Sequence, residues 1–376
     1  MANYKKIGIP DPPNLEMTCQ AIKARQTFSY IIYPEEAHFP IAFVKVVYTN
    51  YLTLESELAT NFNPNNIYMF VMDKKAPKMF QYRMRQLSNC FVNVLVSEKT
   101  FDLKSSGYNI VLAQYHCLKL LLEHKWKYVV ILENDDIMIK TNQEVVKILH
   151  AFNGTNDVGT VNLGHLHVSR KMFALMTDWS LKSLGIHPTL PEAYQNQSLV
   201  ISKSISQATL SFEAVYHMFN VLNLTTFLDT VNGHNFEHEL ATSTLNANEI
   251  LGIPGGFTTK CLFENPFGAT TRFSKWSFDP KVRKHCLSGN IRHGICILGM
   301  WDMEFLTQLN TFTVNKMLQN FDFGGIECWH EYIWNRQHVT REIDLDMAFY
   351  ENLPEVRWNR LKSAGKLKEF TCKTYF

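Results

Sequence analysis

Several features that would assign the chain to a common class are missing from its 376 residues. No run approaches the roughly 18 consecutive apolar residues that a membrane-spanning helix needs, and the N-terminus lacks the apolar core of a signal peptide. The 37 basic and 35 acidic residues nearly cancel, so there is no electrostatic footprint for nucleic acid. Neither a GxGxxG fingerprint nor a GxxxxGKS/T loop is present, so a bound nucleotide must be held in another way. We therefore expect a soluble chain with no nucleic-acid partner.

Eight cysteines are present, but no two of them form a CxxC pair, which argues against a structural zinc site. Spacing alone leaves two alternatives, reduced thiols in the core or long-range disulfides. Three N-glycosylation sequons, at Asn153, Asn196 and Asn223, favour a secretory compartment.

What the sequence does contain is enough apolar material for a large core. The 46% of hydrophobic and 13% of aromatic residues exclude a disordered protein. The length is compatible with one large α/β domain with additions, or with two domains.

The stretch 126–142 organises the chain. An apolar run from Tyr128 to Leu132 ends abruptly in Glu133, Asn134, Asp135 and Asp136, as a buried parallel strand does at the edge of its sheet. Ligands of open α/β sheets bind at the carboxyl ends of the strands. The alternative is that the acidic residues form only the solvated start of the next helix.

A regular alternation of strands and helices surrounds this stretch. Four predicted strands alternate with four predicted helices, the strands at 41–48, 67–73, 92–98 and 128–132 and the helices at 52–62, 79–90, 108–124 and 141–152, the last capped by Thr141 or Asn142. Such repeated βα units predict a doubly wound, mostly parallel sheet with right-handed connections.

The other segments are less regular. Residues 1–36 are polar and contain proline, which predicts a loosely ordered arm, and 154–204 reads as a long functional loop. We expect helices over 207–231, a strand over 291–302, and C-terminal helices over 305–336 that are separated near the glycines at 324 and 325.

Several of these segments carry a resemblance to a known family. Residues 35–43, 65–76, 90–94, 126–128 and 136–142, and further along 272–276, 292–297, 299–302, 315–316 and Cys328, resemble the core-2/I-branching β-1,6-N-acetylglucosaminyltransferases in sequence, order and spacing. The fourteen-residue step from Asp302 to Lys316 is retained. The resemblance covers about 35–336, although 154–204 is not recognisable.

The resemblance implies a GT-A-like glycosyltransferase fold, a Rossmann-like and mostly parallel sheet with helices on both faces. Residues 37–152 would form the nucleotide-sugar-binding half and 153–340 the acceptor and catalytic half of one domain, with 1–36 an arm and 341–376 a C-terminal tail. It also implies a Golgi membrane enzyme facing the lumen, held by an N-terminal anchor that this sequence does not contain. The implied reaction moves N-acetylglucosamine from UDP-GlcNAc to a glycan hydroxyl with inversion, as in β-1,6 branching of O-glycans, and needs neither metal nor cofactor.

Five residues are implied as substrate contacts. Arg292 and Lys316 stand at the family's diphosphate positions, where fixed cations would take the role of a divalent ion. Asp73, at a strand end, is expected to meet the uridine or ribose, with helix capping as the alternative. Asp136 is a matched residue whose alternative is a purely structural contact, and Trp276 lies in the matched segment 272–276.

An inverting transfer needs a general base for the proton of the attacking hydroxyl. The family places Ala-Thr four and five residues after this glutamate, and Glu237 precedes Ala241 and Thr242 at that spacing. Glu237 is therefore the predicted base and Glu239 the competitor. Phe236 replaces the family's aspartate before the base, and His238 is expected to face solvent.

Departures from the family bear on the donor and on the disulfides. The segment 104–107 and Asn134 differ from the family, which leaves the donor sugar open. The resemblance implies disulfides between Cys286 and Cys296 and between Cys19 and Cys90. Met69 replaces the cysteine that would pair with Cys117, which predicts a free buried thiol.

Three functional classes compete. The first is the metal-independent transferase. The second is a metal-dependent glycosyltransferase of different donor specificity, in which Glu133, Asp135 and Asp136 hold Mn²⁺ beside the donor diphosphate. The third is a non-catalytic glycan or nucleotide binder that has kept the fold.

Overall fold

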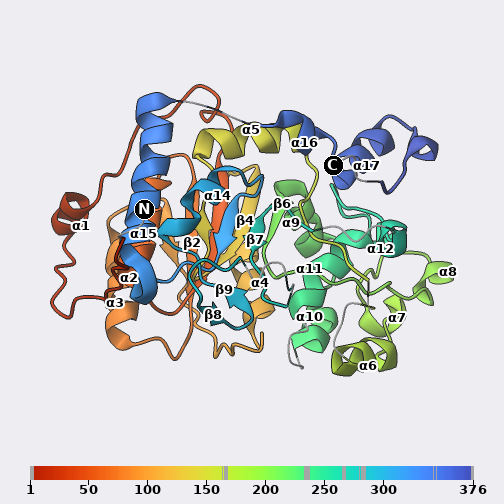
Figure 1. Cartoon of the computed structure of the whole chain (residues 1–376). Helices are drawn as coiled ribbons and strands as arrows, with labels where there is room; N and C mark the ends of the chain where they lie inside the picture. Colours follow the sequence, from red (N-terminus) through yellow and green to blue (C-terminus); the bar gives the residue numbers. More distant parts are fainter. Residues whose placement is uncertain are drawn as a thin grey trace.

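The computed structural model describes residues 4–162, 164, 168–232, 238–264, 268–278, 280, 285–341, 343 and 345–373. A five-stranded sheet lies at the centre, with the strand order β3-β2-β1-β4-β6 (Figure 1). Its strands are β1 (Ile41–Val47), β2 (Ile67–Met72), β3 (Val94–Val96), β4 (Tyr128–Glu133) and β6 (Ala208–Ser211). The first four are parallel, and β6 runs antiparallel to β4. The predicted α/β class with a mostly parallel sheet is confirmed.

Helices cover both faces of the sheet, which explains why β1 is apolar almost throughout. Ala42, Val44 and Val46 pack on one side in a core shared with α4 (Ile110–Leu121), α9 (Phe212–Asn220), α10 (Thr225–Asn232) and α11 (His238–Ala247). Ile41 and Phe43 pack on the other in a core shared with α2 (Tyr51–Thr60), α3 (Lys78–Asn89) and α5 (Asn142–Phe152). Each core removes a large apolar area from water, and burial of this kind is the main favourable contribution to folding.

All four predicted βα units are present, with boundaries shifted by a few residues. The start of α5 is fixed by a capping box, as the sequence suggested for Thr141. The Glu144 N–H donates to Thr141 Oγ1 at 3.2 Å, and the Thr141 N–H donates to Glu144 Oε2 at 2.9 Å.

The prediction of helix from residue 207 onward was wrong at its beginning. Residues Ala208–Ser211 form β6, which pairs with β4 so that Tyr128 lies opposite Ser211. A strand of four residues leaves too little periodicity to separate it from the helix α9 that follows at once. Ser211 then caps α9 by accepting the Ala214 N–H at 3.2 Å.

The C-terminal half adds a second sheet that the sequence did not reveal. Its order is β5-β10-β7, with β5 (Ile137–Met138), β10 (Thr313–Asn315) and β7 (Arg272–Ser274). β10 falls within 305–336, where only helices were predicted, between α14 (Met303–Thr307) and α15 (Gln319–Asn335). The strands have two or three residues and pair only with segments that are far away in sequence, so no local sequence pattern predicts them.

One further expectation for this half was wrong, and another was confirmed. Residues 291–302 form a hairpin, β8 (Ile291–Arg292) with β9 (Ile295–Cys296), followed by the 3₁₀ turn η3 (Met300–Asp302). The predicted separation of helices near Gly324 and Gly325 is present as a kink in α15 at Asp322, where the backbone is not helical (φ -154°, ψ 69°). A Cβ at Gly325 would lie 2.9 Å from the Met300 nitrogen, so the glycine allows η3 to approach the helix.

The segment 154–204 is not a plain loop. It contains α6 (Val168–Met176), α7 (Leu181–Leu184) and α8 (Glu192–Gln195). Two of these helices have a single turn, and helices this short leave little periodicity for sequence analysis.

Disulfides fasten both ends of the chain. Cys19–Cys90 attaches α1 (Cys19–Arg25), so the predicted arm is partly helical and anchored to the end of α3. Cys286–Cys296 is formed as the resemblance implied, and Cys117 is a buried free thiol as predicted. A third disulfide, Cys261–Cys372, joins α12 (Cys261–Glu264) to the C-terminus, while Cys328 is free and exposed.

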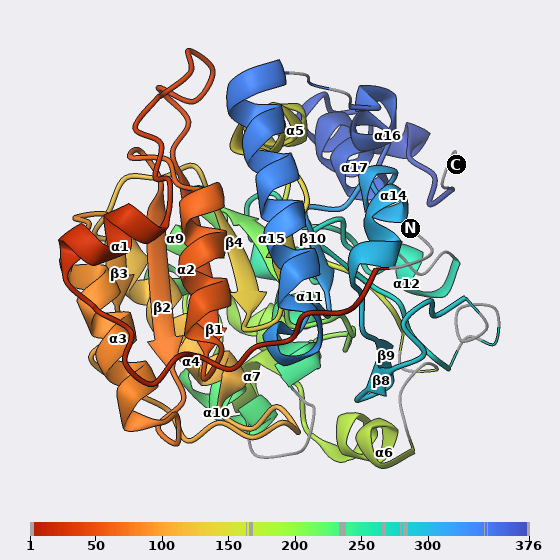
Figure 2. The same ribbon diagram turned by 60° about the vertical axis from the view of Figure 1, so that its left-hand side comes forward.

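The C-terminal segment folds back beside α5 (Figure 2). It consists of α16 (Met347–Glu351), α17 (Pro354–Ser363) and the turn η5 (Leu367–Glu369), and the π-helical turn η4 (Arg336–Thr340) precedes it. A further short turn, η2 (Glu249–Leu251), follows α11. Among the residues that the structure describes, no helix has the length and apolarity to span a membrane.

Candidate active site at the carboxyl edge of the sheet

A cavity of about 620 Å³ opens where β1, β2 and β4 end, and we call it the carboxyl-edge cavity. Its volume is within the usual range of roughly 300–1,000 Å³ for ligand pockets. It is lined by Val46, Tyr48, Asp73, Lys75, Leu103, Lys104, Ser105, Ser106, Ile110, Glu133, Asn134, Asp135, Arg292, His293, Asn315 and Lys316. The sequence-based expectation of a site at this edge of the sheet therefore coincides with a cavity.

Asn134 joins the ends of β1 and β4. Its Oδ1 accepts the Tyr48 N–H at 2.9 Å and the Thr49 N–H at 3.2 Å, and its Nδ2 donates to Asp135 Oδ1 at 2.9 Å. Asn134, which differs from the family at this position, thus orients Asp135. Both residues line the cavity.

Asp136 is fully buried and is not among the lining residues. Its carboxylate accepts the Glu133 N–H at 2.6 Å, Gln207 Nε2 at 3.0 Å and Asn315 Nδ2 at 2.8 Å, and Arg272 lies 3.8 Å away. Burial raises the pKa of the Asp136 carboxyl, and the nearby Arg272 opposes this shift. The geometry is that of a structural hub beneath the cavity, the alternative that the sequence left open.

Arg292 and Lys316 reach the cavity from different segments. Arg292 ends β8, and the tight hairpin turn continues through His293 in the left-handed conformation at φ 51° and Gly294 at φ 77°. Lys316 directly follows β10, and its carbonyl accepts the Leu298 N–H at 2.9 Å. The hairpin and the second sheet therefore bring two cations to the ends of the parallel strands, from which they are far apart in sequence.

Burial lowers the pKa of Lys316; Asp135 opposes this shift, and Arg292 adds to it. The pKa of His293 is also lowered, first by burial and then by Lys316 and Arg292. These shifts describe a partly dry site in which Arg292 and Lys316 repel each other, and an anionic ligand would relieve this repulsion.

Tyr48 is a lining residue that the sequence analysis did not single out. Burial raises its pKa to about 12, Asp135 adds to the shift, and Arg292 opposes it. The phenol therefore stays protonated and can donate a hydrogen bond. Its position in the sequence could have indicated this role, because the predicted strand 41–48 ends at Tyr48 just as the predicted strand 67–73 ends at Asp73.

Asp73 lines the cavity and also shapes the chain around it. Its Oδ1 accepts the Lys75 N–H at 3.0 Å and the Leu103 N–H at 3.4 Å. Lys75 Nζ lies 2.9 Å from Asp102 and 3.9 Å from Asp73. The carboxylate thus holds the following turn while remaining at the cavity wall, and it does not cap α3, whose N-cap residue is Pro77.

The start of α11 lies next to the loop 104–107. A Cβ at Gly107, which has φ 97°, would come within 1.8 Å of His238 Nδ1, so only glycine permits this contact. Lys104, Ser105 and Ser106 of the same loop line the cavity. Glu237, the predicted base, precedes His238 and lies outside the described residues.

The competitor Glu239 is engaged elsewhere. Its Oε2 lies 3.2 Å from Lys203 Nζ, and its backbone carbonyl accepts the Ser204 N–H at 2.9 Å. Glu239 is therefore one partner of an ion pair with Lys203.

Trp276 is not a lining residue of the carboxyl-edge cavity. It bridges to Ile295 of β9 and stacks on Phe278 with ring centroids 5.4 Å apart. Trp276 therefore supports the hairpin that carries Arg292.

The acidic side chains considered for Mn²⁺ do not share one environment. Glu133 and Asp135 both line the cavity, and Glu133 also accepts a hydrogen bond from Ser206, whereas Asp136 is buried and bonded to Gln207. Within the described ranges, no group of three His, Cys, Asp or Glu side chains is arranged to hold a metal ion.

Fold and site define an α/β protein with a charged ligand cavity at the strand ends. The family model of the Core-2/I-Branching enzymes matches residues 41–307. The chain belongs to this family and is a glycosyltransferase of the N-acetylglucosaminyltransferase type.

Curated relatives agree with this assignment at low identity. The chain is 25% identical over 323 residues to "Beta-1,3-galactosyl-O-glycosyl-glycoprotein beta-1,6-N-acetylglucosaminyltransferase 4" of Danio rerio, covering 84% of this chain and 74% of the relative. It is 26% identical over 324 residues to "N-acetyllactosaminide beta-1,6-N-acetylglucosaminyl-transferase" of Mus musculus, covering 84% and 78%.

Similarity to solved structures is weak. TarS (residues 1–349) of S. aureus gives a TM-score of 0.31 at 13% identity, over 88% of this chain and 83% of that chain. The mannosyltransferase PcManGT from Pyrobaculum calidifontis gives a TM-score of 0.27 at 11% identity, over 57% and 58%. At such scores neither structure adds to the assignment.

Proposed function

We propose that the protein transfers N-acetylglucosamine from UDP-GlcNAc to a glycan hydroxyl with inversion, forming a β-1,6 branch without a metal ion. The observation that carries this proposal is the convergence of Arg292 and Lys316 on the carboxyl-edge cavity in a chain of the Core-2/I-branching family. A diphosphate is the ligand that two partly dry cations suit best.

Departure of UDP is the step for which these cations are needed. As the bond between the sugar C1 and the β-phosphate oxygen breaks, negative charge grows on the diphosphate. Arg292 and Lys316 stabilise this charge because they are already in place and need little reorganisation. Tyr48 and Asn315, which line the same cavity, offer neutral donors to the remaining oxygens.

Proton transfer is the second requirement. The acceptor hydroxyl oxygen attacks C1 as its proton passes to the Glu237 carboxylate, so that the bond to the leaving group and the O–H bond break in the same displacement. The contact between His238 and Gly107 supports this role because it brings the residue after Glu237 to the loop that lines the cavity.

The other predicted site residues have distinct parts in the proposal. Asp73 meets the uridine or ribose of the donor while it holds its own turn. Asp136 acts as a positioning residue by orienting Asn315, and Trp276 supports the hairpin and meets the acceptor from the hairpin side.

We further propose that the chain works on the luminal side of the Golgi membrane, as one domain with a donor half at 37–152 and an acceptor half at 153–340. Three disulfides support an oxidising compartment.

The test is a donor screen. UDP release from several UDP-sugars is measured with a panel of glycan acceptors, with and without excess EDTA. We expect turnover with UDP-GlcNAc that EDTA leaves unchanged. Activity that EDTA abolishes and Mn²⁺ restores would establish the metal-dependent alternative. Retained UDP binding without transfer to any acceptor would establish a non-catalytic binder.

A further inference from the structure

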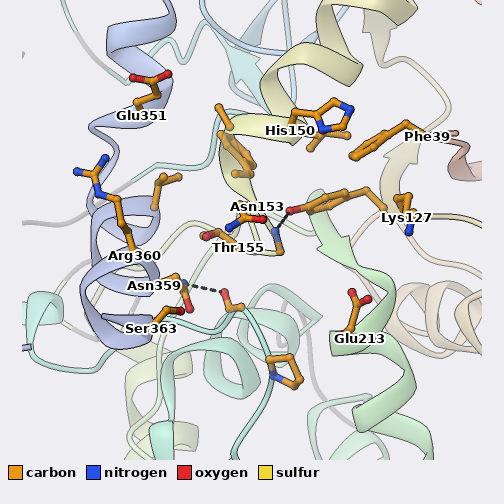
Figure 3. Close-up of a pocket in the computed structure, with 18 of the residues that line it drawn as sticks. Phe39, Lys127, His150, Asn153, Thr155, Glu213, Glu351, Asn359, Arg360 and Ser363 are labelled. Carbon is orange, nitrogen blue, oxygen red and sulfur yellow. Dashed lines mark hydrogen bonds between the residues drawn. The ribbon is translucent and has the colours of Figure 1, made fainter. Parts of the chain in front are cut away.

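A second cavity, of about 720 Å³, lies at the opposite edge of the sheet, where β1 and β4 begin, and we call it the amino-edge cavity (Figure 3). Its walls come from the end of α5, from α17, and from the segments that enter β1 and β4. It is larger than the carboxyl-edge cavity, and nothing in the proposed reaction uses it.

Asn153 lies in the middle of this cavity. It ends α5 in the left-handed conformation (φ 45°, ψ 55°), and its N–H bonds to the carbonyls of Leu149 and His150 fix its backbone. In Figure 3 its side chain lies between Arg360 of α17 and Lys127 before β4. The side chain is exposed, and within the described part of the chain its amide has no hydrogen-bond partner.

Asn153 is also the acceptor asparagine of the sequon Asn153-Gly154-Thr155. The turn after it is rigid, because the Gly154 N–H donates to Tyr128 Oη at 2.6 Å and the Thr155 N–H to the Phe152 carbonyl at 2.9 Å. A group attached to Asn153 Nδ2 would therefore begin within the cavity, beside the residues that line it.

The lining suits a neutral and polar occupant. Lys127 and Arg360 contribute two positive charges, and Glu213 and Glu351 contribute two negative ones, so these four charges cancel. Carboxylates accept hydrogen bonds and the cations donate them, as a polyhydroxylated ligand requires. The ring of Phe39, 4.2 Å from that of His150, adds an apolar surface at the rim. Because these charges cancel, the lining has no net charge to favour an anion such as phosphate, whereas a neutral sugar can bond to both kinds of side chain.

We propose that Asn153 carries an N-linked glycan and that its first N-acetylglucosamine residues occupy the amino-edge cavity. The three disulfides support passage through the compartment in which such glycans are added. In the attachment, Asn153 Nδ2 loses one proton and forms a bond to the sugar C1, and a lipid diphosphate leaves with the electron pair of the broken C1–O bond. This happens on the nascent chain, before Thr155 is buried. The folded protein then uses the sugar to bridge α5 and α17.

The test compares sites within one molecule. The full chain is secreted from cultured eukaryotic cells behind a cleavable signal sequence. Its glycans are removed with peptide-N-glycosidase F in ¹⁸O-labelled water, native or denatured, and mass spectrometry reads each site separately. We expect Asn153 to be occupied and to be released at least about tenfold more slowly from the native protein, because the enzyme must await local opening. Asn196 and Asn223 are exposed outside this cavity, and any glycan there should be released at similar rates in both states.

Variants keep the result specific. Thr155→Val should abolish the glycan at Asn153, because it removes the sequon hydroxyl while Asn153 keeps its own conformation; Thr155→Ser should retain it. Glu351→Ala and Arg360→Ala should each speed native release at Asn153, since each opens one wall of the cavity, without affecting Asn196. An unmodified Asn153 peptide, or equal native and denatured release rates, would overturn the proposal. Neither readout involves UDP-sugar turnover, so this proposal and the proposed function fail independently.

Discussion

The two edges of the central sheet carry cavities of similar size that differ in their lining residues. The carboxyl-edge cavity, about 620 Å³, is lined by Arg292 and Lys316. Burial lowers the pKa of Lys316 there. The amino-edge cavity, about 720 Å³, balances its charges and surrounds a sequon asparagine. The larger cavity therefore lies away from the strand ends at which the transfer is proposed.

Strand direction and charge explain the difference. Parallel strands all end at one edge, where the connections to the helices part and leave side chains such as Asp73 and Tyr48 facing a common space. At the other edge, β1 and β4 are entered from the segments around Phe39 and Lys127, and α17, near the C-terminus, lines part of the space. If transfer depends on the carboxyl edge alone, substitutions at that edge should reduce it and leave the amino-edge cavity unchanged.

The largest effect is expected for Glu237→Gln. The amide keeps the shape of the side chain but cannot take up the proton of the acceptor, so kcat should fall by about 10²- to 10⁴-fold. The dissociation constant of UDP, measured by calorimetry, should hardly change. Native release at Asn153 should be unaffected, which would separate the two edges.

Glu239→Gln is the control for that variant. Because Glu239 is paired with Lys203, its substitution should leave most of the activity. Loss of transfer in Glu239→Gln together with an active Glu237→Gln would move the base by two residues.

A smaller effect is expected for Arg292→Met and Lys316→Met. Each variant removes one charged donor to the diphosphate, worth about 1.5–3 kcal/mol, so the dissociation constant of UDP should rise about 10- to 100-fold. Lys147→Met, at an exposed lysine of α5 that lines neither cavity, is the matched control. If UDP affinity fell as much in the control, or not at all in the two variants, the assignment of the diphosphate site would be wrong.

The smallest effect concerns pH. The pKa of Lys316 lies below the ordinary lysine value of 10.5, so its charge is lost earlier as the pH rises. A bound diphosphate favours the charged form and raises that pKa again. UDP affinity should therefore fall in the alkaline range, by at most about tenfold per pH unit, because one proton is linked to binding.

Lys316→Arg provides the comparison for the pH profile, since a guanidinium keeps its charge throughout this range. Its UDP affinity should stay flat where that of the wild type falls. The same alkaline decline in both proteins would show that another group titrates.

Within the site, prediction from sequence succeeded for residues tied to a strand end and failed where orientation depends on distant partners. The acidic cluster after β4 was placed at the correct edge because its apolar strand could be recognised. Which member lines the cavity was not decided by local sequence. Asp136 turns inward because Gln207, directly before β6, and Asn315 of β10 supply the donors that satisfy it.

The sequence by itself determined the βα rhythm of the first half, because a strand buried on both faces must be continuously apolar and an amphipathic helix must repeat every 3.6 residues. Together with the matched segments, that was enough for the fold class, the family and two of the disulfides. Tertiary structure alone decided the second sheet, the Cys261–Cys372 disulfide and the amino-edge cavity. Each of these joins segments far apart in the chain, and such contacts depend on how packed elements meet rather than on any local pattern.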